Sequence, residues 1–393
     1  MKTVSILGAT GSVGCSTVDL ILSQKQDFDV QVLSAQSNVD LLAAQARQLQ
    51  AKMAVIGDEN LYGALKEKLS GTGIEVAAGR DAVIAAGTYP AHCIVAAIIG
   101  MAGLEPLMKA LAQGTCVAIA NKEPLVAAGP LVMAAAEKHG ATILPVDSEH
   151  NAIFQVFEPE NKSSIERLVL TASGGPFRSW SREQMDAATP EQAVAHPNWS
   201  MGAKISVDSA SMMNKALEVI EAHYLFGMPG DKIEVLVHPQ SIIHSMVEYA
   251  DGSFLAQLGA PDMKTPIACA LAWPKRMPTS GARLDLTQLK RLDFEPMDYE
   301  RFPLLLMAYD CLKAGQGSCL TFNAANEVAV AAFLARRIGF GDIRRVIAAA
   351  LAQVQEKSLQ SLEDILLLDH TVRQQSESYI TNSIISHKRV HSG

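Results

Sequence analysis

The chain has 393 residues, of which 49% are hydrophobic and 19% are charged, and its formal net charge is −8 at pH 7. This length predicts two or three domains with substantial cores, and the acidic balance argues against a nucleic-acid-binding surface. The six cysteines are scattered without C-x-x-C spacing, which is typical of small buried hydrophobes in a reducing compartment. No apolar run reaches the length of a membrane span and the first predicted strand starts at residue 4, so we expect a cytoplasmic protein.

The amino-terminal residues carry a nucleotide-binding pattern. An apolar strand is predicted at residues 4–7, followed by glycines at 8, 11 and 14 and then by an amphipathic helix. Glycines at this spacing allow a tight turn and let a pyrophosphate approach the backbone N–H groups at the start of the helix. A second strand is predicted at residues 30–34, at the expected distance, so the pattern predicts dinucleotide binding.

The end of that second strand bears on the choice of cofactor. NAD sites usually place an acidic residue there to bind the ribose 2′-hydroxyl. This chain has Gln36, Ser37 and Asn38, with no acid before Asp40, which favours NADP. No Arg or Lys is present to bind a 2′-phosphate either, so the preference rests on the missing acid.

Residues 1–147 alternate strand and helix throughout. Further strands are predicted at 53–56, 94–97, 116–119 and 143–146, with helices such as 40–50 and 107–113 between them, which indicates a doubly wound, Rossmann-type parallel sheet. The carboxyl ends of parallel strands line the ligand crevice in this architecture. Lys122 follows one of these strands and is therefore expected to face a cofactor or substrate, the alternative being a solvated helix start.

Two segments further along supply the parts of a metal site. Asp147 and Glu149 are two residues apart, which in an extended chain places their side chains on the same side. A helix is predicted from near Ser211, which places Asn214 and Glu218 on one helical face. Three carboxylates suit a hard divalent cation such as Mg²⁺ or Mn²⁺.

Polar side chains beside these carboxylates suit a phosphorylated substrate. Ser209, Asn214 and Lys215 could bind hydroxyl groups and a phosphate. Ordinary structural roles are the alternative. Asp147 or Ser148 could cap a helix over residues 152–157, and the second segment could be a solvated helix face.

The remainder of the chain divides into three predicted parts. Residues 148–272 form an α+β domain with strands at 168–172, 235–238 and 245–249, and an Asp-Gly turn at 251–252 predicts a hairpin to 254–258. Within it, residues 173–202 contain a short polar helix and a polar, glycine-flanked segment with Trp199, which we interpret as a flexible lid, the alternative being a surface loop. Residues 273–298 are a predicted linker, and 299–393 a helical domain that packs and supports a dimer.

The longer motifs resemble those of the 1-deoxy-D-xylulose 5-phosphate reductoisomerase family. The resemblance covers essentially the whole chain and rests on residues 8–14, 120–123, 145–151, 171–177, 196–202, 206–218, 238–246 and 322–327. It implies an NADPH domain, a central catalytic domain, a carboxyl-terminal helical bundle and a homodimer. It also implies the isomerisation and NADPH-dependent reduction of 1-deoxy-D-xylulose 5-phosphate to 2-C-methyl-D-erythritol 4-phosphate in non-mevalonate isoprenoid biosynthesis.

The resemblance also implies roles for individual residues. The metal ligands (Mn²⁺, Mg²⁺ or Co²⁺) would be Asp147, Glu149 and Glu218, which with Lys122 form the catalytic set. Three members of that set, Lys122, Glu149 and Glu218, would also bind the substrate. The other substrate-binding residues would be Ser148, Ser173, His196, Trp199, Met201, Ser209, Asn214 and Lys215. The cofactor would be bound by Gly8, Thr10, Gly11, Ser12, Val13, Ser37, Asn38, Asn121, Glu123 and Gly202.

One departure and two rival functions remain. Many members of the family carry a Lys or Arg where this chain has Ser37, which puts the strength of NADP preference in doubt. The rival enzyme is another Rossmann-fold NADP-dependent sugar-phosphate or semialdehyde dehydrogenase, which needs no carboxylate triad. The non-enzymatic alternative is an NADP-sensing regulatory protein.

Overall fold

The computed structural model describes residues 1–199, 201–354 and 359–385. The chain forms two compact units, each built from separate stretches of sequence. The first consists of Met1–Pro124, Val132–Gln155 and Asp262–Leu284, and the second of Leu125–Leu131, Val156–Pro261 and the residues from Asp285 onward.

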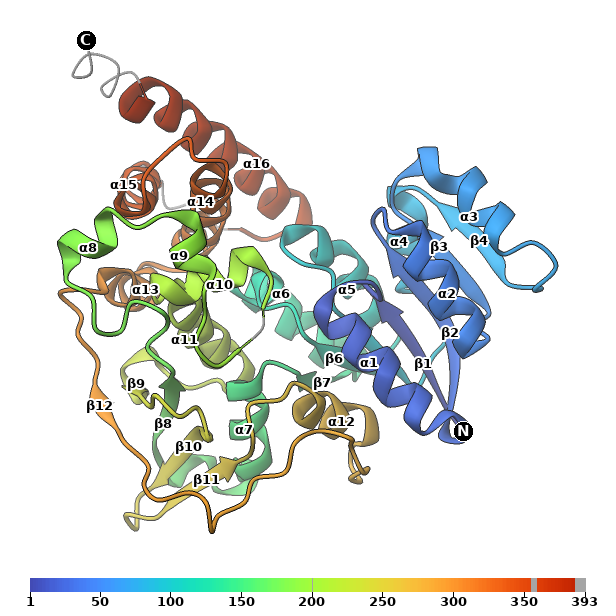
Figure 1. The fold of residues 1–393 in the computed structure, drawn as a ribbon, viewed down its shortest axis with the longest axis horizontal. Helices are drawn as coiled ribbons and strands as arrows, with labels where there is room; N and C mark the ends of the chain where they lie inside the picture. Colours follow the sequence, from blue (N-terminus) through green and yellow to red (C-terminus); the bar gives the residue numbers. More distant parts are fainter. Residues whose placement is uncertain (200, 355–358, 386–393) are drawn as a thin grey trace. The chain divides into compact units, whose positions relative to one another are not determined.

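A seven-stranded parallel sheet forms the centre of the first unit (Figure 1). The order β4-β3-β2-β1-β5-β6-β7 confirms the predicted doubly wound sheet, and it reverses direction between β1 and β5, where such sheets bind ligands. The edge strand β4 was not predicted, because its sequence Glu-Val-Ala-Ala has a weak apolar pattern. The strands are β1 (Lys2–Leu7), β2 (Phe28–Ala35), β3 (Met53–Ile56), β4 (Glu75–Ala78), β5 (Cys93–Ala96), β6 (Cys116–Ile119) and β7 (Thr142–Pro145).

Helices pack around this sheet and bury their apolar sides against it. Val18 and Ile21 of α1 lie in the same core as Val4 and Ile6 of β1. That core also contains Ile267 and Leu271 of α12, a helix that the sequence placed in the middle domain and that belongs to the first unit. The helices are α1 (Ser12–Ser23), α2 (Val39–Leu49), α3 (Tyr62–Lys68), α4 (Arg80–Ala86), α5 (Leu104–Leu111), α7 (Ser148–Val156) and α12 (Lys264–Ala272), with α6 (Glu123–His139) kinked at Ala128.

A five-stranded mixed sheet lies in the second unit, in the order β11-β10-β8-β9-β12. The pair β8–β9 is parallel, whereas β10 runs antiparallel to both β8 and β11, so the predicted α+β domain contains a mixed sheet. The predicted hairpin at residues 251–252 joins β10 to β11. The two-residue strand β12 falls within the predicted linker and was missed. The strands are β8 (Ile165–Ala172), β9 (Ile233–Val237), β10 (Ile243–Tyr249), β11 (Phe254–Leu258) and β12 (Glu295–Pro296).

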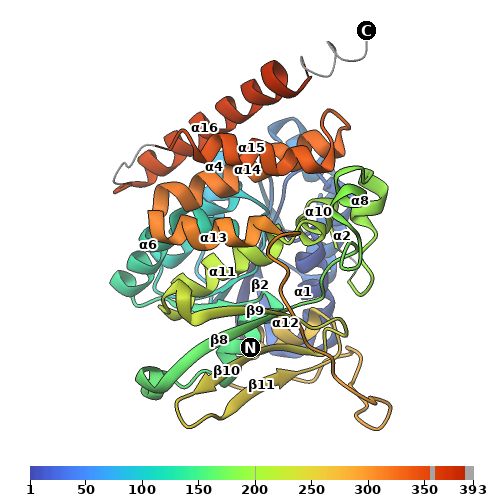
Figure 2. The same cartoon turned by 90° about the vertical axis from the view of Figure 1, so that its left-hand side faces the viewer.

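Helices cover one face of this sheet and continue into a helical bundle. Figure 2 shows α11 and α13 on one side of β8 and β9. The bundle is built around α14, which contacts α13, α15 and α16 and buries Phe322 and Phe333 completely or nearly so. The helices of this unit are α8 (Arg182–Asp186), α9 (Pro190–Val194), α10 (Ala203–Ala210), α11 (Met213–Phe226), α13 (Pro303–Ala314), α14 (Gln316–Leu334), α15 (Phe340–Leu351) and α16 (Leu362–Tyr379).

Among the described residues, no helix has both the length and the apolar character needed to cross a membrane.

Candidate active site

The glycine turn after β1 is built from close backbone contacts. Gly8 has φ +93°, and a Cβ there would lie 2.5 Å from the carbonyl oxygen of Ala97. A Cβ on Gly14 would collide with the carbonyl oxygen of Gly8, so the first turn of α1 packs directly on the turn before it. Gly11 stands at the N-cap of α1 and has no such neighbour, which leaves its backbone open to a ligand.

Two polar residues that sequence reasoning overlooked hold this turn in place. The backbone N–H groups of Gly8 and Ala9 donate to the carbonyl oxygen of Ser34, at 3.2 and 2.7 Å. Gln45 of α2 donates to the carbonyl oxygen of Ala9 at 3.0 Å from a buried position. The end of β2 and the following helix therefore fix the glycine turn, a role that only their three-dimensional position reveals.

The segment that bears on cofactor choice is exposed at residues 36–38. The side chain of Asn38 caps α2 by accepting a hydrogen bond from the backbone N–H of Leu41 at 3.1 Å. The nearby cations have other partners, since Arg47 donates to the carbonyl oxygen of Lys68 and the Lys68 ammonium pairs with Asp40. Of the two exposed residues directly before α2, Asn38 is engaged in capping and Ser37 is not.

The carboxyl end of β6 positions Asn121, Lys122 and Glu123. Asn121 is 7% exposed and donates to the carbonyl oxygens of Ile98 and Gly100, which ties α6 to the segment after β5. A small cavity lies beside it, at the carboxyl ends of β1, β5 and β6. It is lined by Leu7, Ala96, Ile98, Gly103, Pro106, Leu107, Ile119, Asn121 and Pro124.

Lys122 forms an ion pair with Asp147, whose side chain is 14% exposed. Strand β7 ends at Pro145 and α7 begins at Ser148, so the expectation that Asp147 and Glu149 share an extended segment is wrong. Glu149 stands in the first turn of α7, where it accepts a hydrogen bond from the Ser148 hydroxyl. The helix begins at Ser148, four residues before the predicted start at residue 152. Ser148 and Glu149 therefore lie in its first turn, shortly after the end of β7.

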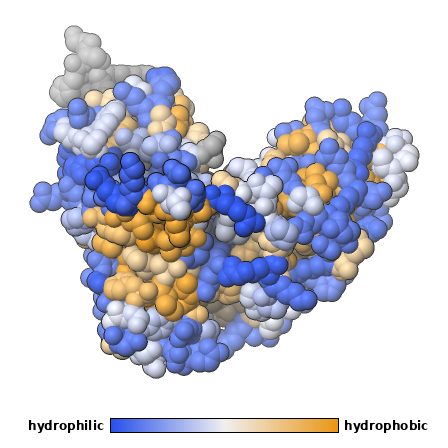
Figure 3. All heavy atoms as spheres, turned by 60° about the horizontal axis from the view of Figure 1, so that its bottom comes forward, coloured by the Kyte–Doolittle hydropathy of each residue, from blue (hydrophilic) through white to orange (hydrophobic). Residues whose placement is uncertain are grey.

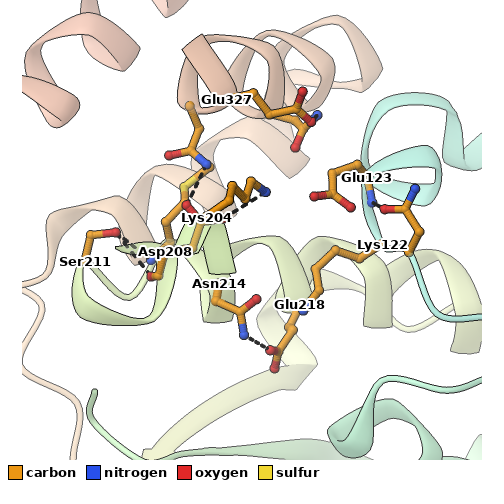
Figure 4. A network of polar contacts seen from close by, with 12 residues as sticks. Lys122, Glu123, Lys204, Asp208, Ser211, Asn214, Glu218 and Glu327 are labelled. Carbon is orange, nitrogen blue, oxygen red and sulfur yellow. Dashed lines mark hydrogen bonds and ion pairs between the residues drawn. The ribbon is translucent and has the colours of Figure 1, made fainter. Parts of the chain in front are cut away.

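In the second unit, α11 carries a buried polar cluster. Glu218 is fully buried, and its carboxylate accepts hydrogen bonds from Asn214 and Lys215 (Figure 4). The predicted shared helical face of Asn214 and Glu218 is therefore confirmed, and the solvated-face alternative is wrong. The predicted helix start near Ser211 is confirmed to within two residues, since α11 begins at Met213, but the separate helix α10 that ends at Ala210 was not predicted.

A corner separates α10 from α11. Met212 lies between the two helices with φ +60°, a conformation that is strained for a residue with a side chain. Ser209 stands near the end of α10 and Asn214 in the first turn of α11, one on each side of this corner. A sequence pattern of helical residues on both sides gives no sign of this break.

Ser173 and His196 meet in the same unit. The Ser173 hydroxyl lies 2.9 Å from His196 Nε2, and His196 Nδ1 accepts hydrogen bonds from the backbone N–H groups of Asn198 and Trp199. An accepting Nδ1 requires the neutral ring with its proton on Nε2. Burial lowers the pKa of His196 below its ordinary value, which agrees with that assignment. Gly175, with φ +65°, lies against the carbonyl oxygen of Ser209 and so joins the Ser173 loop to α10.

The segment that follows His196 contacts the loop between β9 and β10. Asn198 donates to the carbonyl oxygen of Pro239 at 2.7 Å, and the ring of Trp199 lies 6.2 Å from that of His244. Met201 is partly exposed and Gly202 is the N-cap of α10. Residue 200 lies outside the described residues.

Part of the predicted lid is regular structure that is anchored in the second unit. It contains two capped helices, α8 and α9, where one was expected. Phe177 is fully buried and packs against Trp180 and Phe340. Phe177, Met185, Ala188 and Ala193 are buried and anchor this stretch in the second unit, whereas most of the residues between them are exposed.

Family comparisons cover nearly the whole described site. Residues 4–129 match the model for 1-deoxy-D-xylulose 5-phosphate reductoisomerase. Residues 143–226 match the model for the carboxyl-terminal domain of that enzyme, and residues 258–375 match a further DXP reductoisomerase carboxyl-terminal domain.

Individual relatives align over almost their full length. A 1-deoxy-D-xylulose 5-phosphate reductoisomerase from Rhodospirillum centenum is 58% identical over 373 residues, which are 95% of this chain and 93% of the relative. A solved structure of the Zymomonas mobilis enzyme in complex with NADPH superposes with a TM-score of 0.92 at 51% identity, covering 97% of this chain and 99% of that one. Another, of DOX-P reductoisomerase with NADPH, fosmidomycin and magnesium, has a TM-score of 0.91 at 42% identity, covering 97% and 98%. The chain belongs to the 1-deoxy-D-xylulose 5-phosphate reductoisomerase family.

Proposed function

We propose that this chain carries out its family's reaction with the residues placed above, namely the isomerisation and NADPH-dependent reduction of 1-deoxy-D-xylulose 5-phosphate to 2-C-methyl-D-erythritol 4-phosphate. The observation that carries the residue assignment is the buried cluster on α11. Glu218 is fully buried, yet it is charged and is held by an amide and an ammonium. Burying such a group costs free energy, so its presence points to a ligand that needs it.

The three carboxylates of Asp147, Glu149 and Glu218 would hold one divalent cation. Their donor atoms are all anionic oxygens, which fit Mg²⁺, Mn²⁺ or Co²⁺ and suit none of the softer metals that prefer sulfur. When bound, the cation polarises the substrate's carbonyl and stabilises negative charge on the oxygens it contacts. Within this chain, Asp147 forms an ion pair with Lys122, and Glu218 forms one with Lys215 and accepts a hydrogen bond from Asn214, so two of the three carboxylates have a cationic neighbour.

Lys122 would then face the substrate. Its ammonium has three donors and pairs with Asp147, so it can donate to a substrate oxygen beside the metal. Ser148, with a hydroxyl 9% exposed at the start of α7, would hold a second substrate oxygen. Both residues orient the reacting oxygens, and Lys122 can supply a proton to an alkoxide as it forms.

The phosphate group of the substrate would bind to Ser173, His196, Ser209, Asn214 and Lys215. Within the second unit, the Gly175 contact places the Ser173 loop beside Ser209, and the neutral His196 presents Nε2–H on the same side as the Ser173 hydroxyl. Hydroxyl, imidazole, amide and ammonium donors together suit a dianion. Because the phosphate is remote from the reacting carbons, its binding energy can hold fragments of a cleaved intermediate and close the site.

The first unit would be the NADPH domain. The glycine turn would receive the pyrophosphate on the backbone of Thr10, Gly11, Ser12 and Val13, and the cavity beside Asn121 would receive the nicotinamide end, with Glu123 nearby. Ser37 would donate to the 2′-phosphate. Gly202, the N-cap of α10, would also bind the cofactor.

We restrict the lid to residues 194–202. This shorter segment contains Trp199 and Met201 and contacts its surroundings through a few polar groups, whereas residues 177–193 contain the two capped helices and are anchored by the buried Phe177 and Met185. Closure of such a segment over the substrate would exclude water from the carbonyl and from the hydride acceptor.

The chain is further proposed to form a homodimer through its five-stranded sheet. Strand β11 is an unpaired edge, and its Phe254, Leu255 and Leu258 are 46%, 39% and 41% exposed. Figure 3 shows hydrophobic atoms gathered on the side of the molecule where β10 and β11 lie in Figure 1. An exposed apolar edge strand invites pairing with a second chain. A cytoplasmic location remains a prediction of the sequence.

The deciding experiment is an NADPH-oxidation assay at 340 nm with 1-deoxy-D-xylulose 5-phosphate. We expect turnover that is lost in EDTA and restored by Mn²⁺. Metal-independent turnover would favour another sugar-phosphate dehydrogenase, and tight NADPH binding without any turnover would favour a regulatory protein. Light scattering after size exclusion tests the dimer, with Phe254→Asp expected to give the monomer mass.

A further inference from the structure

One motif of the helical bundle has no role in the reaction as described. Residues 322–327 lie in the middle of α14, and Asn326 among them is completely buried. Its amide donates to the Asp208 carboxylate on α10 at 2.9 Å. A buried polar residue in the centre of a bundle costs stability unless it has a partner, so this contact calls for an explanation.

Asp208 is itself 1% exposed and uses both carboxylate oxygens (Figure 4). Oδ1 accepts from Asn326, and Oδ2 pairs with the Lys204 ammonium at 2.9 Å, one turn earlier in α10. Apolar residues of similar size would pack α10 on α14 at less cost, because a buried ion pair rarely repays its desolvation. What the polar arrangement adds is a single defined position of one helix on the other.

That position matters because of what lies next to Asp208. Ser209 follows it directly, and Ser211 donates from its hydroxyl to the Asp208 carbonyl oxygen at 3.2 Å. The strained residue Met212 comes next, and after it Asn214 and Lys215 of α11. A left-handed conformation at a methionine persists only where the surroundings hold it. The Asp208 contacts supply that restraint from the α10 side of the corner.

We propose that Asp208, held by Asn326 and Lys204, is a positioning residue for the phosphate end of the substrate site. It touches no substrate atom. It fixes the end of α10 on the helical bundle, so that Ser209 and the first turn of α11 present their donors to the phosphate together. The inference rests on the proposed phosphate site, and it gives the α14 motif a role in substrate binding instead of packing alone.

The test is the charge-neutral variant Asp208→Asn in the full-length protein with metal. We expect the KM for the substrate and the inhibition constant of inorganic phosphate to rise together by about tenfold, equivalent to about 1.4 kcal/mol. The dissociation constant of NADPH should change by less than about twofold, because the glycine turn lies in a separate unit. The double variant Asp208→Asn/Asn326→Asp exchanges amide and carboxylate across the same contact, and it should recover most of the lost phosphate affinity.

A matched control is Asp369→Asn. Asp369 is also a buried aspartate of the bundle, on α16, and it pairs with Arg373 of the same helix, which in turn pairs with Glu327 of α14. We expect this variant to lower the melting temperature as Asp208→Asn does, but to leave the KM and the phosphate inhibition constant within about twofold of wild type. An equal rise in both variants would reduce the Asp208 effect to general loss of stability and overturn the proposal.

The remaining outcomes distinguish a failure of the proposed phosphate site from a failure of the positioning role of Asp208. If inorganic phosphate does not compete with the substrate in the wild type, the phosphate site is misassigned and the positioning role falls with it. If phosphate competes and a folded Asp208→Asn binds it normally, only the positioning role is overturned. Should Asp208→Asn not fold, Asn326→Ala removes one partner and keeps the Lys204 pair, and an unchanged phosphate inhibition constant in that variant would also overturn the proposal.

Discussion

The glycine turn of the first unit and the α10–α11 corner of the second are both suited to anions, but the turn would bind them with backbone groups and the corner with side chains. The turn consists of backbone, with Gly8 and Gly14 in contacts that a Cβ would forbid. The corner consists of side chains, with Glu218, Lys215 and Asp208 buried as charged groups. A backbone site can be read from spacing, because only glycine permits it. A side-chain site depends on which helices meet, and its local sequence resembles that of an ordinary helix.

This difference predicts that the two regions fail in different ways. Changes to the glycine turn should affect the fold and cofactor binding together, since one set of atoms serves both. Changes in the corner should affect metal binding, substrate binding and stability to degrees that depend on the side chain removed, and should leave NADPH binding nearly intact. Five experiments test this contrast.

The largest effect is expected from the metal ligands. Glu218→Gln keeps the shape of the side chain but removes the charge that pairs with Lys215. We expect kcat to fall on the order of a hundredfold or more, with NADPH affinity nearly intact, because a metal site loses a ligand charge while the cofactor unit is untouched. Steady-state kinetics at limiting Mn²⁺ provide the measurement, with Asp147→Asn and Glu149→Gln in parallel. Near wild-type activity in any one of them would remove that residue from the ligand set.

The next largest effect concerns two glycines of the turn. In Gly14→Ala the new Cβ meets the Gly8 carbonyl, so α1 must move and both the melting temperature and NADPH binding should fall. In Gly11→Ala the nearest atom is 3.5 Å away, so the fold should be preserved while the methyl group obstructs the pyrophosphate. Thermal denaturation and NADPH fluorescence titration separate the two. An equal loss of stability in both variants would contradict the idea that only Gly14 is a packing glycine.

Trp199 offers a smaller, purely functional effect. It is partly exposed, and the ring of His244 lies 6.2 Å from its own ring. We expect Trp199→Ala to raise the KM for substrate and to lower kcat, with the melting temperature changed by only a few degrees, as for a residue outside the core. Phe177→Ala is the contrasting variant, because Phe177 is fully buried in the same predicted lid and should lower the melting temperature strongly. A large stability loss in Trp199→Ala would make it a packing residue.

Ser37→Arg tests cofactor choice by adding the positive charge that residues 36–38 lack. A charge-assisted hydrogen bond to the 2′-phosphate contributes about 1.5–3 kcal/mol, so the KM for NADPH should fall while that for NADH stays nearly constant. Because residue 37 is exposed, the new side chain has room and stability should not change. Kinetics with both cofactors measure this, and a parallel change in both values would place the 2′-phosphate elsewhere.

The smallest effect is a pH dependence at His196. Burial lowers its pKa from the ordinary value of 6.5, so the unfolded chain binds the proton more tightly than the folded one. The stability linked to the neutral ring is therefore fully present above about pH 6.5 and is lost as the pH falls through the folded pKa. We expect the difference in melting temperature between wild type and His196→Gln to shrink on going from pH 7.5 to pH 5.5. A difference that does not vary with pH would mean that His196 is not buried as a neutral ring.

The sequence determined the parts of this protein that depend on local pattern. The doubly wound sheet followed from apolar strands alternating with helices, the glycine turn from its spacing, and the β10–β11 hairpin from Asp251-Gly252. The face shared by Asn214 and Glu218 followed from the period of the α-helix, which holds wherever a helix forms. The family itself was recognisable from motifs that run through the whole chain.

Tertiary structure alone decided the rest. The break at Met212, the early start of α7 at Ser148 and the packing of Phe177 depend on neighbours that are distant in sequence, and no local pattern encodes them. The same is true of Asp208, whose partner Asn326 is 118 residues away, and of Ser34 and Gln45 around the glycine turn. A polar residue acquires such a role from the group it meets when the chain folds, because a buried hydrogen bond depends on the position of both partners.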